Sequence, residues 1–182
     1  MIFYAGLPVI LAAYILKVFG GGAAEQIEID LLAVFWRGLL VAFGYAAAVF
    51  DIKTKKIPNG LVLTMLAAWA VTLAPKIIID AGAAVELIKS SALGFAAGGL
   101  IFLAVYIISR KGLGGGDVKF MAAVGLYIGF SGALAAMLYG TLLAALTGVT
   151  LLLMKKIGRK DAIPLAPFLY AGILIALFFG QY

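Results

Sequence analysis

The sequence contains no cysteine and no histidine, and only 12 % of its 182 residues are charged. Without cysteine, the chain cannot form a disulfide framework. Because cysteine and histidine are the usual ligands of zinc, iron–sulfur clusters, haem and copper, we expect neither a metal nor a cofactor. A soluble domain would have about a quarter of its residues charged, so this composition excludes that class.

Apolar residues take the place of the missing charge. They make up 65 % of the sequence, and the mean hydropathy is +1.18. Such a chain is too hydrophobic to be intrinsically disordered. Its apolar segments are continuous, whereas an outer-membrane barrel would show short alternating segments. The composition therefore predicts an all-α protein that crosses the membrane several times.

Seven apolar stretches are predicted to form helices, over 2–19, 31–50, 59–75, 84–109, 118–130, 132–154 and 162–180. We expect them to pack as an integral membrane helical bundle with about six to seven transmembrane helices. The fifth and sixth stretches meet at Phe130, Ser131 and Gly132, which predicts a tight helical hairpin.

No polar segment is long enough to form a soluble domain, so we expect residues 1–182 to be a single membrane-embedded domain. Residues 1–30 would form an N-terminal helix and an outer loop, and residues 31–182 would form the core. The first helix has an alternative interpretation as a secretory signal peptide. Because no basic residues precede its apolar run, we expect it to be retained.

Basic residues gather on alternate connections between the predicted helices. Ten of the 14 lie there: Lys53, Lys55, Lys56, Arg110, Lys111, Lys119, Lys155, Lys156, Arg159 and Lys160. Cytoplasmic loops of membrane proteins carry an excess of such residues, so these connections and the N-terminus are predicted to be cytoplasmic. The same basic rim predicts contact with anionic lipids, and we expect no nucleic-acid partner.

Two of the eight acidic residues, Asp51 and Asp117, need an explanation beyond exposure in a loop. Both are predicted at the cytoplasmic boundary of the membrane, where a carboxylate is costly unless it is paired, hydrated or used. Each alone is explained as a residue at a helix end, and Asp117 would be a natural N-cap. Two aspartates at matching depth favour a functional pair.

A glycine run, Gly112-Leu113-Gly114-Gly115-Gly116, precedes Asp117. No lysine of a phosphate-binding loop follows it and no strand precedes it, so it is not a nucleotide-binding motif. A flexible loop is one interpretation. The other is that the glycines adopt positive φ and let a substrate backbone approach the acid closely.

Three sequence blocks resemble the type IV prepilin peptidase family, a group of GxGD membrane aspartyl proteases. Gly114-Gly115-Gly116-Asp117 fits the GxGD motif, and Asp51 with Ile57-Pro58-Asn59 is similar to the family's first aspartate and the helix start after it. Ile163-Pro164-Leu165-Ala166-Pro167-Phe168 is similar to the segment that opens the family's last helix. The blocks occur in the family's order.

The resemblance implies a membrane endopeptidase that removes the basic leader from prepilin-like precursors at the cytoplasmic face of the inner membrane. Asp51 and Asp117 would be catalytic, supported by Gly114, Gly116, Lys53, Lys119, Pro58, Asn59, Pro164 and Pro167. Many larger members also methylate the new N-terminus and carry a cysteine-rich insertion, so the lack of cysteine predicts a peptidase-only form. Archaeal preflagellin peptidases share the core, which leaves preflagellin-like precursors as alternative substrates.

Two aspartates that share a proton can hydrolyse a peptide bond by general acid–base catalysis. The main alternative is a proton- or ion-coupled transporter that uses the same carboxylates, although transporter sites usually lie near the middle of the bilayer. A structural subunit in which both aspartates cap helices is a third possibility. Binding of anionic lipid is the alternative role for Lys53 and Lys119.

Overall fold

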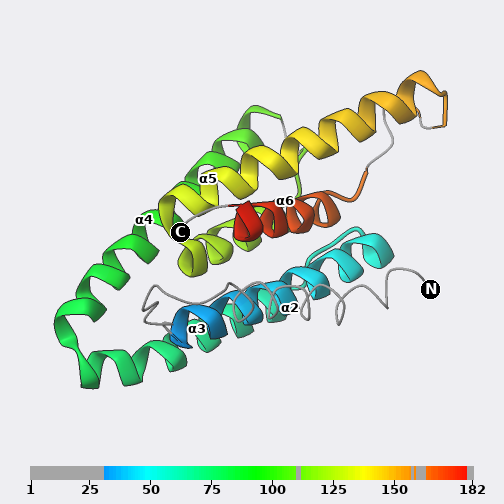
Figure 1. Cartoon of the computed structure of the whole chain (residues 1–182). Helices are drawn as coiled ribbons and strands as arrows, with labels where there is room; N and C mark the ends of the chain where they lie inside the picture. Colours follow the sequence, from blue (N-terminus) through cyan, green and yellow to red (C-terminus); the bar gives the residue numbers. More distant parts are fainter. Residues whose placement is uncertain (1–30, 110–111, 157, 159–162, 180–182) are drawn as a thin grey trace, which may run out of the picture.

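The computed structural model describes residues 31–109, 112–156, 158 and 163–179. These residues form α2 (Leu31–Thr54), α3 (Asn59–Ile79), α4 (Ala81–Ile108), α5 (Gly115–Leu153) and α6 (Ala166–Phe179), shown in Figure 1. The described residues include no strand, so the predicted all-α fold is confirmed. The helix predicted over 2–19 lies outside the described residues.

Four of the described helices, α2 to α5, are long and apolar enough to cross a membrane. Large apolar side chains are exposed on them, including Ile78 and Ile79 of α3 and Leu153 of α5, which are 85 %, 83 % and 77 % exposed. Soluble monomers rarely expose large contiguous apolar patches, whereas lipid covers such side chains in a membrane. The chain is therefore a multi-pass membrane protein.

Several helices extend beyond their predicted bounds. Apolar character predicts that the first described helix ends at residue 50, but α2 continues to Thr54 because Lys55, with φ 53°, provides a left-handed end. At the start of α4, Asp80 Oδ1 accepts a hydrogen bond of 3.0 Å from the Ala83 N–H, so this helix begins at Ala81. Asp51 therefore lies within a helix rather than after it.

α5 consists of two helices joined at Gly129. This residue has φ 66° and ψ −170°, a conformation that glycine adopts readily. Figure 1 shows the segments before and after the break running in opposite directions. The predicted helical hairpin is therefore confirmed, and its turn lies one residue before the predicted Phe130–Gly132 connection.

Small residues allow α4 and the first half of α5 to lie unusually close together. A Cβ added at Gly94 would collide with the backbone at Gly125, and one added at Gly98 would collide with the backbone at Met121. Helix association in lipid depends on such close contacts, since lipid tails are as apolar as the side chains. The pairing also shows that the two helices are antiparallel.

α6 packs between α2 and the second half of α5. A Cβ at Gly172 of α6 would collide with the Ala136 carbonyl of α5, and the ring of Tyr170 covers Gly44 of α2. Tyr170 also makes an edge-on ring contact with Tyr45, with ring centroids 6.3 Å apart. These contacts hold α6 against both helices.

Candidate active site

Asp51 lies in the last turn of α2, and only 6 % of its surface is exposed. Its Oδ2 accepts a hydrogen bond of 2.9 Å from the backbone N–H of Ala166, the first residue of α6. The first N–H groups of a helix have no partner within that helix, so the carboxylate satisfies one of them. The start of α6 therefore determines the orientation of Asp51.

The proline-rich segment before α6 explains how this helix start is formed. Pro167 lies in the first turn of α6, where its missing N–H costs no hydrogen bond. Pro164 is partly buried just before the helix. The Phe168 N–H donates to the Leu165 carbonyl at 3.0 Å and completes the first turn. The segment thus presents the Ala166 N–H to Asp51.

Asp117 lies in the first turn of α5 and is 8 % exposed. Its backbone N–H donates to the Gly114 carbonyl at 3.1 Å. Its Oδ1 is buried and has no hydrogen-bond partner within the described part of the chain. A buried carboxylate oxygen without a partner is costly, so native proteins keep such atoms mainly where they serve a function.

The structure brings together the two aspartates that the sequence singled out. They lie close enough for the charge of one to act on the other. The other acidic residues of the described part, Asp80 and Glu86, are both exposed. Two like charges that act on each other resist simultaneous ionisation, and a shared proton removes their repulsion. The pair is thus suited to contain one acid and one base.

Two of the glycines before Asp117 lie so close to neighbouring atoms that a side chain would not fit there without a shift. A Cβ at Gly114 would lie 2.7 Å from Asp117 Oδ2, and one at Gly116 would lie 3.2 Å from the Cβ of Ile57. Gly115, in contrast, has open space on its Cβ side. The expectation of positive φ was wrong for these positions, because Gly129 is the positive-φ glycine of the described residues and Gly114 has φ −74°.

Lys119 and Asn59, both singled out as supporting residues, contact each other. Lys119 Nζ donates to Asn59 Oδ1 at 3.0 Å, which links the first turns of α5 and α3. Pro58 is the N-cap of α3, and its carbonyl accepts from the Leu61 N–H at 3.1 Å. Lys53 is exposed in the last turn of α2, two residues after Asp51.

Two contributors to this site, Ala166 and Ile57, lie in the sequence blocks that resemble the family but were not singled out as supporting residues. Ala166 acts through its backbone N–H, which every residue except proline has, so its side chain gives no signal. The signal that was available is Pro167, because proline is common in the first turn of a helix. Ile57 packs against Gly116, and although it belongs to the Ile57-Pro58-Asn59 block, its apolar side chain gave no signal of this contact.

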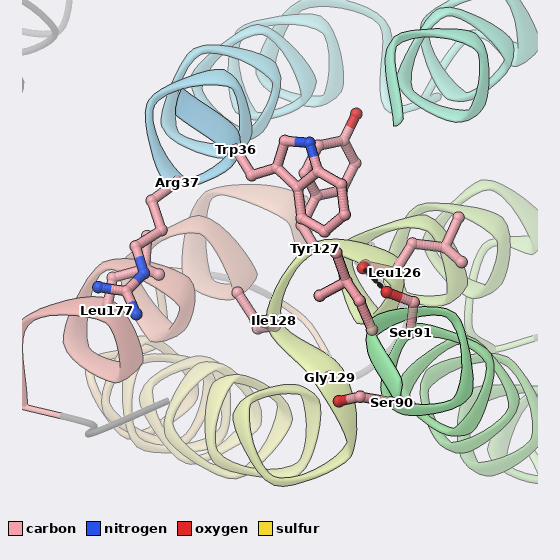
Figure 2. A pocket seen from close by; sticks show the side chains of 10 residues that line it. Trp36, Arg37, Ser90, Ser91, Leu126, Tyr127, Ile128, Gly129 and Leu177 are labelled. Atoms are coloured by element: carbon pink, nitrogen blue, oxygen red, sulfur yellow. Dashed lines mark hydrogen bonds between the residues drawn. The ribbon is translucent and has the colours of Figure 1, made fainter. Parts of the chain in front are cut away.

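A separate cavity of about 150 Å³ lies beside the Gly129 turn (Figure 2). Most of its polar groups already have partners in the fold. The hydroxyl of Ser91 donates to the Leu126 carbonyl at 2.7 Å, and that of Tyr127 donates to the Met65 carbonyl at 2.6 Å. The lining also includes Trp36, about four turns before Asp51 on α2 and so on the order of 20 Å away. We assign this cavity no part in the aspartate chemistry.

The fold and the site define a polytopic helical membrane protein with a buried pair of aspartates at helix ends. Residues 38–149 match the Type IV leader peptidase family, and this span includes both Asp51 and Asp117. Because the match covers more than half of the sequence, the chain belongs to that family.

Several curated relatives carry the name prepilin leader peptidase/N-methyltransferase. One from Bacillus subtilis (strain 168) is 30 % identical over 161 residues, which cover 88 % of this chain and 60 % of the relative. One from Burkholderia pseudomallei is 27 % identical over 151 residues, which cover 78 % of this chain and 47 % of the relative. One from Xanthomonas campestris pv. campestris is 27 % identical over 155 residues, which cover 80 % of this chain and 52 % of the relative. The chain thus spans about half to three fifths of the length of these relatives. No solved structure matches it.

Proposed function

We propose that this chain is a membrane aspartyl endopeptidase that removes the leader peptide from type IV prepilin-like precursors. The observation that carries the proposal is that Asp51 and Asp117 are both buried and lie near enough to interact electrostatically, in a member of the Type IV leader peptidase family. The names of its relatives favour prepilin-like over preflagellin-like substrates. The transporter alternative gains no support from the family, and both aspartates lie at helix ends.

In the proposed mechanism, the ionised aspartate removes a proton from water, whose oxygen attacks the scissile carbonyl carbon. The protonated aspartate donates its proton to the carbonyl oxygen, which gives a diol intermediate. As the C–N bond breaks, the first aspartate passes the proton from water to the leaving amine, and the second regains a proton from the diol. The Ala166 N–H holds one oxygen of Asp51 in place, and Asp117 Oδ1 has no competing partner within the described part of the chain. Both steps use these two side chains and water.

We further propose that the site faces the cytoplasm. Lys55 and Lys56 are exposed just after α2, which carries Asp51, and Lys155 and Lys156 are exposed after α5. The positive-inside rule places these lysines at the cytoplasmic face, in reach of anionic lipid headgroups. Of the supporting residues, Lys119, Asn59 and Pro167 have structural roles that hold the helix starts around the two aspartates.

The proposal is tested by co-expressing the chain with candidate prepilins and measuring leader cleavage. Asp51→Asn and Asp117→Asn should each reduce cleavage by at least about 100-fold, because a positioned acid or base contributes that much. Glu86→Gln makes the same carboxylate-to-amide change at an exposed position and should keep full activity. Full cleavage by either aspartate variant, at equal protein level in the membrane, would refute the mechanism.

A further inference from the structure

An apolar groove of about 520 Å³ opens on the side of the bundle. α3 and α4 diverge from the junction that joins them (Figure 1), and residues in the first half of α5 line the space between them. The lining includes Leu66 of α3, Phe95, Ala96 and Leu100 of α4, and Val118 and Lys119 of α5. Lys119 is its one charged member. The groove is thus shaped for an elongated apolar occupant.

One end of the groove lies at the start of α5, the helix that carries Asp117 in its first turn. Val118 and Lys119, which directly follow Asp117, line that end. Because α4 and α5 are antiparallel, Leu103 of α4 lies near this end and Phe95 lies deeper. The eight-residue step between them corresponds to about 12 Å, or roughly two helical turns. The groove therefore leads from the start of α5, next to Asp117 in sequence, toward the middle of the bundle.

The position of the groove restricts its occupant. Within hydrocarbon, a polypeptide must satisfy its backbone hydrogen bonds internally, so a peptide that enters from the side is helical. The apolar lining requires apolar side chains on that helix. Lys119 uses one of its three N–H donors on Asn59, which leaves others for an acidic side chain at the same end of the occupant. Just before that end in sequence, a Cβ added at Gly115 would have open space around it.

We propose that this groove holds the apolar helix of the substrate, with the helix end nearest the scissile bond beside Lys119. The bond to be cut then lies just outside the helix, where an extended backbone can reach Asp51 and Asp117. This inference rests on the proposed peptidase function and adds the location and chemistry of substrate binding. It also makes entry lateral, from the bilayer, rather than from the aqueous face.

Filling the groove should weaken substrate binding without changing the chemistry. Ala96→Trp places a large ring in the groove, while Ala104→Trp makes the same change at an exposed position of α4 outside the lining. For a prepilin-type precursor in phosphatidylethanolamine–phosphatidylglycerol vesicles, Ala96→Trp should raise KM about tenfold and leave kcat unchanged. Ala104→Trp should leave both constants unchanged.

A photo-crosslinker provides an independent measurement that needs no intact groove packing. At Leu100, in the lining, it should capture the precursor, while at Ile101, which is exposed but outside the lining, it should capture lipid only. The assignment of the groove as the substrate-binding site would be refuted by a wild-type KM for Ala96→Trp. It would also be refuted if the crosslinker at Leu100 captured only lipid in the presence of saturating precursor. Neither result would contradict the proposed peptidase function. Absence of precursor cleavage by the wild-type protein overturns the peptidase function itself.

Discussion

The two aspartates are held in different ways, and this difference decides which substitutions are informative. Asp51 accepts a hydrogen bond from a helix N–H, whereas Asp117 Oδ1 has no partner among the described residues. An asparagine at position 51 can still accept the Ala166 N–H through its side-chain carbonyl. The amide variant therefore preserves the helix contact, and a loss of cleavage in it reports on proton transfer rather than on folding.

Gly114 provides the sharpest test at the scale of one residue. Gly114→Ala places a Cβ 2.7 Å from Asp117 Oδ2, so the carboxylate must move. Because displacement of a catalytic group by about 1 Å costs on the order of 100-fold in rate, we expect kcat to fall by roughly 10- to 100-fold. The measurement is kcat for precursor cleavage at equal membrane levels.

The neighbouring glycine is the matched control for this prediction. Gly115 has nothing within 4 Å of its Cβ position, so Gly115→Ala should keep kcat near the wild-type value. Wild-type activity in both alanine variants would contradict the role assigned to Gly114. Equal loss in both would instead indicate that the loop must be flexible, which is the alternative interpretation of the glycine run.

At the scale of helices, long apolar runs predicted which segments are helical better than they predicted where each helix begins and ends. Hydropathy predicts that the first described helix ends at residue 50. In the structure this helix continues to Thr54, because Lys55 adopts φ 53°. Hydropathy describes the partition of side chains into lipid, whereas a helix end depends on backbone conformation and capping. The hairpin of α5 was predicted because glycine and serine interrupted its run.

The helix interface between α4 and α5 gives a prediction for stability. Gly98→Ala adds a Cβ that collides with the Met121 backbone, and the helices cannot separate without losing neighbouring contacts. Overpacking of this kind costs about 1–3 kcal/mol, so the unfolding free energy in detergent should fall by that amount. A Cβ added at Gly38 of α2 would have no other atom within 4 Å. Gly38→Ala should therefore leave the unfolding free energy unchanged or raise it by up to about 1 kcal/mol. Similar stabilities of the two variants would show that close contact at Gly98 is not needed.

At the scale of the whole molecule, sequence reasoning selected the residues of the candidate site but not the contacts that they make. Asp51 and Asp117 stood out because a carboxylate is costly in so apolar a chain. The Ala166 N–H and the apolar groove did not stand out, since both depend on how helices far apart in sequence approach each other. The Lys119–Asn59 hydrogen bond could not be predicted for the same reason, although each of the two residues was singled out separately.

The absence of cysteine makes the proposed orientation of the molecule directly measurable. Because the chain has no cysteine, a single introduced thiol can be labelled without background. Lys56→Cys lies on an exposed basic connection next to the site, and Ala81→Cys lies on the exposed α3–α4 junction at the other end of α3. The positive-inside rule predicts that a membrane-impermeant maleimide labels intact cells at position 81, and labels position 56 only after the membrane is permeabilised. The reverse pattern would place Asp51 and Asp117 at the outer face, where a cytoplasmic leader peptide cannot reach them.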